Sequence, residues 1–162
     1  MRRVVIGEFP LEGLVPTILM SGNLLDAADL TVSVERYSSP LSSGEERGEL
    51  LVRSHHARPS SNRGERTRFE DPTLAGVLLK ACVHKVLLRR YKLPSSGVLE
   101  VYDWENEGLR ILEGELPGSA PAEGYSVGRD VSREDAFSLW WLAQRPWSRW
   151  APEVRAFWQQ GV

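Results

Sequence analysis

The stretch that most constrains the fold of this 162-residue chain is the apolar run at residues 72–91. Asp71 is a residue type that caps the free amides of a first helical turn, and Pro72 suits the first helical position because its missing N–H is not needed there. At 100° per residue, apolar side chains fill most of the circumference and leave a narrow polar strip that includes His84. The pattern predicts a mostly buried helix, with cations at its C-terminal end and Pro94 preventing its continuation.

A hairpin is predicted on the N-terminal side of this helix. Residues 30–37 alternate apolar and polar side chains, and Glu35 and Tyr37 fall on the polar side, which is typical of a half-buried strand. Residues 49–55 are the expected partner strand. The polar connection at residues 38–48 is rich in turn formers and predicts a long hairpin tip.

A second hairpin is predicted from residues 98–104 and 109–116, which flank a turn that contains Asn and Gly. Residues 117–131 are expected to form an internal loop, and residues 132–160 a Trp-rich part with two helices. Because the strands follow one another in sequence, the expected fold class is α+β. We expect one domain over residues 1–162, with antiparallel hairpins packed on one central buried helix and two C-terminal helices.

Composition sets only broad limits on function. The formal net charge of −2 does not indicate a partner, although the cations are 17 Arg and only 3 Lys. The single cysteine, Cys82, cannot form an internal disulfide, which favours a reduced, cytoplasmic setting. No apolar stretch has the length needed to span a bilayer, so no membrane partner is expected.

The most basic part of the chain is residues 53–68, which hold five arginines and two histidines against one acid, Glu65. Flexible guanidinium groups there suit an anionic partner, such as the phosphates of a nucleic acid. The alternative is a solvated loop whose charges pair with the acids at Glu45, Glu46 and Glu49. The candidate anion-binding residues are Arg53, Arg58, Arg63, Arg66 and Arg68.

The three histidines are His55, His56 and His84. His55 and His56 are adjacent, so on a strand they point to opposite faces and cannot share a metal ion without a bend. If His84 meets one of them in space, the pair suits general acid and base chemistry on a phosphodiester. The alternative for His84 is an ordinary residue at the rim of the helix. No metal and no cofactor are expected.

Five of the six tryptophans lie in the last part of the chain. Trp and Arg are enriched at interface hot spots, so a surface for a protein partner or for a homo-oligomer is expected there. The alternative is that these rings cover the sheet of the same domain. The five are Trp140, Trp141, Trp147, Trp150 and Trp158.

These features together predict a non-enzymatic binding or assembly protein. Its Trp-rich C-terminal surface would bind a protein partner, and its Arg-rich loop would bind an anionic partner such as nucleic acid. One alternative is a small His-dependent nuclease. Another is a structural subunit of a larger particle, in which a neighbour orders the hairpin tip at residues 38–48.

Overall fold

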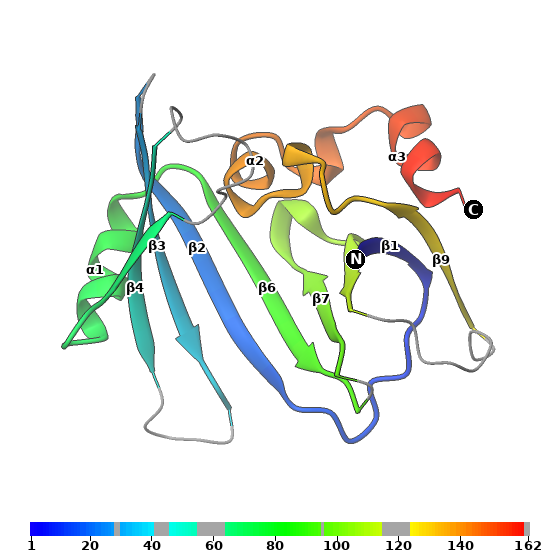
Figure 1. The fold of residues 1–162 in the computed structure, drawn as a ribbon, viewed down its shortest axis with the longest axis horizontal. Helices are drawn as coiled ribbons and strands as arrows, with labels where there is room; N and C mark the ends of the chain where they lie inside the picture. Colours follow the sequence, from blue (N-terminus) through cyan, green and yellow to red (C-terminus); the bar gives the residue numbers. More distant parts are fainter. Residues whose placement is uncertain (28–29, 41–45, 55–63, 95, 115–123, 161–162) are drawn as a thin grey trace.

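The chain folds around one antiparallel sheet with nine described strands in the order β5-β4-β3-β2-β6-β7-β8-β1-β9 (Figure 1). The computed structural model describes residues 1–162 apart from 28–29, 41–45, 55–63, 95, 115–123 and 161–162. The strands are β1 (Arg2–Gly7), β2 (Pro16–Ala27), β3 (Leu30–Ser38), β4 (Arg47–Ser54), β5 (Glu65–Arg68), β6 (Lys85–Lys92), β7 (Val98–Tyr102), β8 (Arg110–Glu113) and β9 (Tyr125–Asp130).

Short helices cover the two faces of this sheet. They are α1 (Thr73–Ala81), α2 (Leu139–Gln144) and α3 (Pro152–Gln159), with single 3-10 turns at η1 (Trp104–Asn106), η2 (Asp135–Phe137) and η3 (Trp147–Arg149). Helix α1 packs on β2, β3 and β4, α2 packs on the opposite side of β2 and on β6, and α3 lies beside β1 and β9. We call the α1 side the outer face and the α2 side the inner face. No helix in the described residues is long and apolar enough to cross a membrane.

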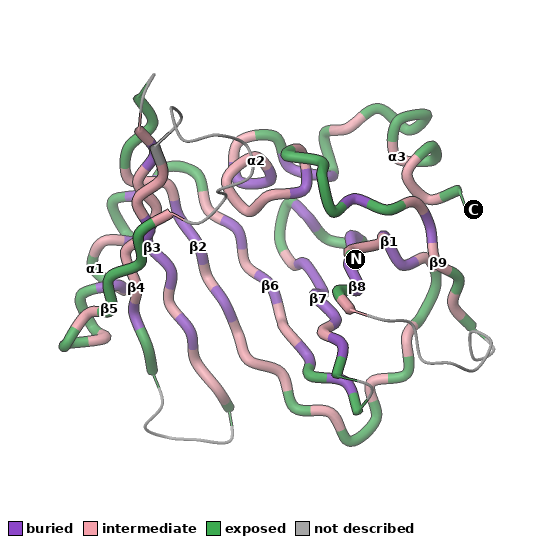
Figure 2. The backbone as a smooth tube through the Cα atoms, viewed as in Figure 1, coloured by how far each residue is buried: buried purple, intermediate pink, exposed green. Residues whose placement is uncertain are grey.

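Both faces of the sheet bury apolar side chains. Figure 2 shows that buried residues recur along the central strands. On the outer face, α1 places Ala75 and Leu79 against Val34. Two glycines make this approach possible, because a Cβ at Gly48 would lie 2.6 Å from the Ala75 Cβ and a Cβ at Gly22 would lie 2.8 Å from Cys82. A second outer cluster covers β1, β6, β7 and β8, and the inner cluster joins the sheet to α2, η2 and η3.

The predicted central helix at residues 72–91 is wrong. Helix α1 ends at Ala81, and the second half of the run is β6, a strand in the middle of the sheet. Val86 and Leu88 of β6 are buried in the inner cluster and Tyr91 in the outer one. A strand that is buried on both faces has apolar residues without a clean period of two, so its sequence resembles a buried helix.

The predicted fold class is therefore wrong as well, because the sheet and not a helix organises the chain. The two expected strand pairings are present: β3 pairs with β4, and β7 with β8. Part of the expected loop at residues 117–131 is strand β9, which pairs with β1, while residues 117–123 lie outside the described residues. Two C-terminal helices are present as α2 and α3. A single domain over residues 1–162 stays a prediction.

Truncation of Leu79 tests how much α1 contributes to stability. Leu79 is 3% exposed in the outer cluster, so Leu79→Ala should lower the free energy of unfolding by about 2–5 kcal/mol. Val77→Ala is the matched control, because Val77 lies on the same helix and is 60% exposed. Urea denaturation of both variants gives the comparison. Equal losses in the two variants would show that α1 is not docked through Leu79.

Candidate functional site

Two glutamate–tyrosine pairs lie on the inner face at positions that are almost fully buried. Glu35 and Tyr37 belong to β3, and Glu100 and Tyr102 belong to β7. Residues two apart on a strand share a face, so each tyrosine can reach its own glutamate. The Tyr37 hydroxyl donates to Glu35 at 2.5 Å, and the Tyr102 hydroxyl donates to Glu100 at 2.9 Å.

Glu100 is also held by two arginines from other strands. Nη2 of Arg90, on β6, donates to its Oε1 at 2.6 Å, and Nη2 of Arg2, on β1, donates to its Oε2 at 3.0 Å. Burial alone would raise the pKa of Glu100, but the attraction of Arg90 and Arg2 outweighs it and the pKa is lowered. Glu100 is therefore a buried anion whose negative charge is balanced within the sheet.

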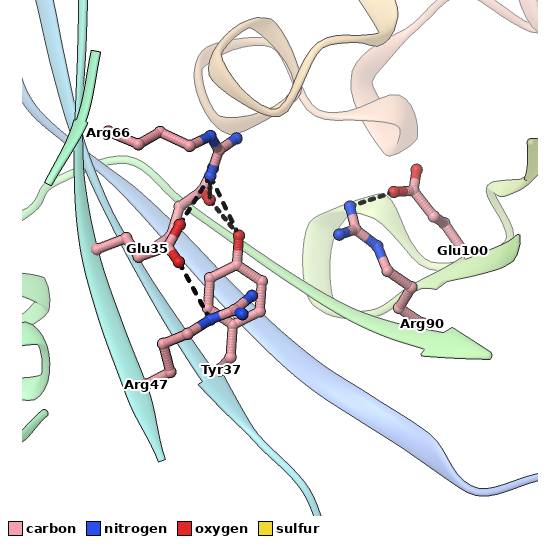
Figure 3. A network of polar contacts seen from close by, with 7 residues as sticks. Glu35, Tyr37, Arg47, Arg66, Arg90 and Glu100 are labelled. Carbon is pink, nitrogen blue, oxygen red and sulfur yellow. Dashed lines mark hydrogen bonds and ion pairs between the residues drawn. The ribbon is translucent and has the colours of Figure 1, made fainter. Parts of the chain in front are cut away.

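A second ion cluster surrounds Glu35 (Figure 3). Nη1 of Arg66, on the edge strand β5, donates to Oε2 of Glu35 at 2.8 Å and to Oε2 of Glu49 at 3.0 Å. Nε of Arg47 contacts Oε1 of Glu49 at 3.1 Å, and the Arg47 guanidinium lies 4.2 Å from the centre of the Tyr37 ring. Burial, followed by the charge of Glu35, raises the pKa of Tyr37 to about 12, so this phenol keeps its proton.

Arg53 completes the set of inner-face arginines. It is opposite Thr31 in the β3–β4 register, on the same face as Glu35. Burial lowers the pKa of Arg53, and the nearby charge of Glu35 only partly offsets this effect. Its Nε atom, like those of Arg2 and Arg90, is buried without a hydrogen-bond partner among the described residues.

We call the part of the inner face that is formed by these arginines and glutamates the arginine face. Its five guanidinium groups exceed its three carboxylates, so it carries net positive charge. Guanidinium groups bind phosphate oxygens in pairs through parallel N–H donors, which makes a phosphate-bearing anion the ligand class that fits this surface. The arginine face consists of Arg2, Arg47, Arg53, Arg66, Arg90, Glu35, Glu49 and Glu100.

The carboxylates of the arginine face do not fit a divalent metal as they stand. A hard cation such as Mg²⁺ takes carboxylate oxygens, but both oxygens of Glu100 and both of Glu49 already contact arginines. The described residues contain no group of three or more His, Cys, Asp or Glu side chains that is arranged to hold a metal ion.

The structure brings only some of the predicted anion-binding residues together. Arg53 and Arg66 lie on the arginine face. Arg68 is exposed and lies opposite Glu49 in the β4–β5 register. The other predicted residues of this segment, Arg58, Arg63, His55 and His56, lie outside the described residues.

His84 lies on an exposed turn between α1 and β6, not on a helix. It borders a shallow pocket with Asn23, Asp26 and Gln144, and no arginine is among the described residues that line that pocket. The described structure therefore does not place His84 beside a phosphate-binding group, as the nuclease alternative requires.

The C-terminal tryptophans pack mainly against one another and against the inner cluster. Trp147 is 2% exposed, and the rings of Trp150 and Trp158 each lie 5.2 Å from Phe137. The Trp140 and Trp141 rings meet edge to face at 5.0 Å. The described rings thus close one end of the inner face. A protein partner at their remaining exposed surface stays a prediction.

Most residues of the arginine face were missed from the sequence. Arg90 was assigned to a helix end, and Glu35 and Tyr37 to the solvent side of a half-buried strand. A signal was available, because Glu-Arg-Tyr at 35–37 and Glu-Val-Tyr at 100–102 place the same Glu-x-Tyr pattern on two predicted strands.

Comparison with known proteins gives a fold but no family. No family model and no curated protein sequence matches the chain. A crystal structure of the hypothetical protein NE1496 matches with a TM-score of 0.60 and 19% identity, over 88% of this chain and 96% of that chain. A structure described as the inorganic triphosphatase NE1496 matches with a TM-score of 0.59 and 18% identity, over 88% and 93%. The fold is shared.

This comparison contradicts the function predicted from the sequence. The second structure is described as an enzyme, whereas the chain was predicted to be a non-enzymatic binding or assembly protein with nucleic-acid binding and oligomer formation. The structural-subunit alternative fails for the same reason, because it too assigned no reaction.

Removal of the Glu100 charge tests the buried ion cluster. Glu100→Gln should lower the free energy of unfolding at pH 7 by about 3 kcal/mol, because it leaves two partly buried arginines without their shared anion. The pKa of Glu100 is lower in the folded protein than its ordinary value of 4.5. The ionised carboxylate therefore stabilises the folded state fully above pH 4.5, and this contribution is lost as the pH falls through the pKa of the folded state. The difference between wild type and variant should therefore shrink in acid.

Urea denaturation at pH 7 and in acid measures this difference. Glu105→Gln is the control, because the Glu105 side chain is 57% exposed and its ion pair with Arg149 lies at the surface. A Glu100→Gln variant as stable as this control at pH 7 would disprove the role of the cluster.

Proposed function

We propose that the chain hydrolyses a phosphoanhydride bond in a short linear phosphate chain, with inorganic triphosphate as the model substrate. The observation that carries the proposal is the arginine face, which gathers five guanidinium groups on one face of the sheet. The likeness in fold to a structure described as an inorganic triphosphatase supports it.

The chemistry of the reaction matches what arginines supply. Water attacks the terminal phosphorus, the bond from that phosphorus to the bridging oxygen breaks, and orthophosphate and diphosphate are released. Negative charge is spread over the oxygens of the transferred group in the transition state, so fixed cations around it lower the barrier. Arginines on paired strands need little reorganisation to do this.

The arrangement of the two ion clusters suits an extended anion. Tyr37 belongs to the cluster around Glu35, where its hydroxyl lies 3.4 Å from Nη1 of Arg66. Arg66 belongs to the edge strand β5, whereas Arg90 belongs to the central strand β6. A chain of phosphates carries several anionic groups that can each meet a guanidinium group, whereas a single phosphate carries one.

A cytoplasmic location belongs to the same proposal. It rests on the single cysteine, Cys82, which is buried and unpaired in the structure. Fractionation of expressing cells with detection of the untagged chain is the measurement, and recovery in a secreted fraction would contradict it.

The purified chain should release orthophosphate from inorganic triphosphate, and removal of accessible arginines should slow the reaction. Arg66→Gln and Arg47→Gln should each lower kcat/KM by roughly 10- to 100-fold, because a hydrogen bond to a charged group contributes about 1.5–3 kcal/mol. Arg36→Gln is the matched control: Arg36 lies next to Glu35 on β3 but points to the outer face, where it pairs with Glu46.

The assay follows orthophosphate release both with a chelator and with added Mg²⁺ or Mn²⁺. Absence of release under all of these conditions would refute the proposed activity. Equal losses in Arg36→Gln and Arg66→Gln would show that the activity does not take place on the arginine face.

A further inference from the structure

The position of Arg66 has a direct consequence for how a phosphate chain is bound, if the proposed function holds. Its Nη1 atom lies 2.8 Å from Oε2 of Glu35 and 3.0 Å from Oε2 of Glu49. A divalent cation that bridges two carboxylates also sits between one oxygen of each, at shorter distances of about 2.0–2.6 Å. A guanidinium nitrogen already occupies that position.

Glu100 and the second oxygen of Glu49 also contact arginines. Glu100 receives hydrogen bonds from Arg90, Arg2 and Tyr102, and Oε1 of Glu49 contacts Arg47. Binding of a metal ion there requires these arginines to move away from Glu100, which is 2% exposed, or from Glu49, which is 14% exposed. The resulting unpaired charges are costly in a low-dielectric site.

The depth of the charged groups favours direct contact between arginine and phosphate. The side chains of Arg47 and Arg66 are 45% and 48% exposed, whereas those of Glu35 and Glu100 are 4% and 2% exposed. An anion that approaches the inner face therefore meets guanidinium groups first, with the carboxylates beneath them. Each guanidinium has five N–H donors, so those that are ion-paired keep donors for a phosphate.

We propose that the arginine face binds the phosphate chain directly through its guanidinium groups, with Arg66 in the position of a bridging divalent cation and no metal ion in the bound complex. The class of ligand is a linear inorganic polyphosphate in its metal-free form. Mg²⁺ competes with the protein for this ligand, because it neutralises the same phosphate oxygens that the arginines contact.

Titration calorimetry with inorganic triphosphate tests the proposal, first in EDTA and then with Mg²⁺ in excess over the ligand. The expected result is binding in EDTA, with Kd at least threefold higher in Mg²⁺. Binding that is tenfold tighter in Mg²⁺, or that requires it, would overturn the inference and leave the proposed hydrolysis standing. Absence of binding under both conditions would overturn both.

Two variants distinguish metal-free binding through the arginines from a metal model, in which the carboxylates hold a divalent cation that binds the phosphates. The two modes predict opposite changes in affinity. Glu49→Gln frees Arg47 and Arg66 from a carboxylate, so it should tighten metal-free binding by about three- to tenfold. If Glu49 were a metal ligand, the same change would weaken binding in Mg²⁺. Arg66→Gln should weaken binding in EDTA at least tenfold, whereas in the metal model it would open the carboxylate pair and strengthen Mg²⁺-dependent binding.

Glu46→Gln is the control for Glu49→Gln. It removes the same charge from an arginine–carboxylate pair, that of Glu46 with Arg36, which lies away from the arginine face. Its Kd for triphosphate should equal the wild-type value in both buffers. A shift in Glu46→Gln as large as that in Glu49→Gln would show that only the net charge of the protein matters, and would overturn the assignment to Arg66.

Discussion

The buried carboxylate of Glu100 is the constraint on which much of this structure depends. A charge in that position costs several kcal/mol of lost hydration unless nearby groups replace the water. The replacements come from three strands: Arg90 from β6, Arg2 from β1 and Tyr102 from β7 itself. A shift of one residue in any of these strands would turn one of the partners to the other face. The cluster thus ties the first strand of the chain to the middle of the sheet and fixes its register.

The pairing of strands that are close in sequence could be predicted from the sequence, but the strand at the centre of the sheet could not. The β3–β4 and β7–β8 pairs follow from alternation and turn residues within short stretches. Strand β6 pairs instead with β7 and with β2, whose paired residues lie more than 60 positions earlier in the chain. It is also buried on both faces. Nothing in its local sequence separates it from the helix before it, because neither Gly nor Pro stands between Ala81 and Lys85.

The candidate site was predictable only in part, for a physical reason. Arg53 and Arg66 were identified because charge density is a local property of the sequence. Glu35 and Glu100 were not, because a carboxylate on a strand is expected to face water unless cations from distant strands enclose it. The Glu-x-Tyr pattern indicates a shared face, but the arginines that make burial possible are supplied by the strand order.

The placement of Arg66 on β5 also affects the exposed edge of the described sheet. An edge strand presents unpaired backbone groups to which a strand of another molecule can add. Strand β5 has four residues, Glu-Arg-Thr-Arg, and all four are exposed. A short edge with charged side chains is a poor template for such addition. The guanidinium group that contacts Glu35 and Glu49 therefore also places a positive charge on the exposed edge of the sheet, where charge disfavours the addition of another strand.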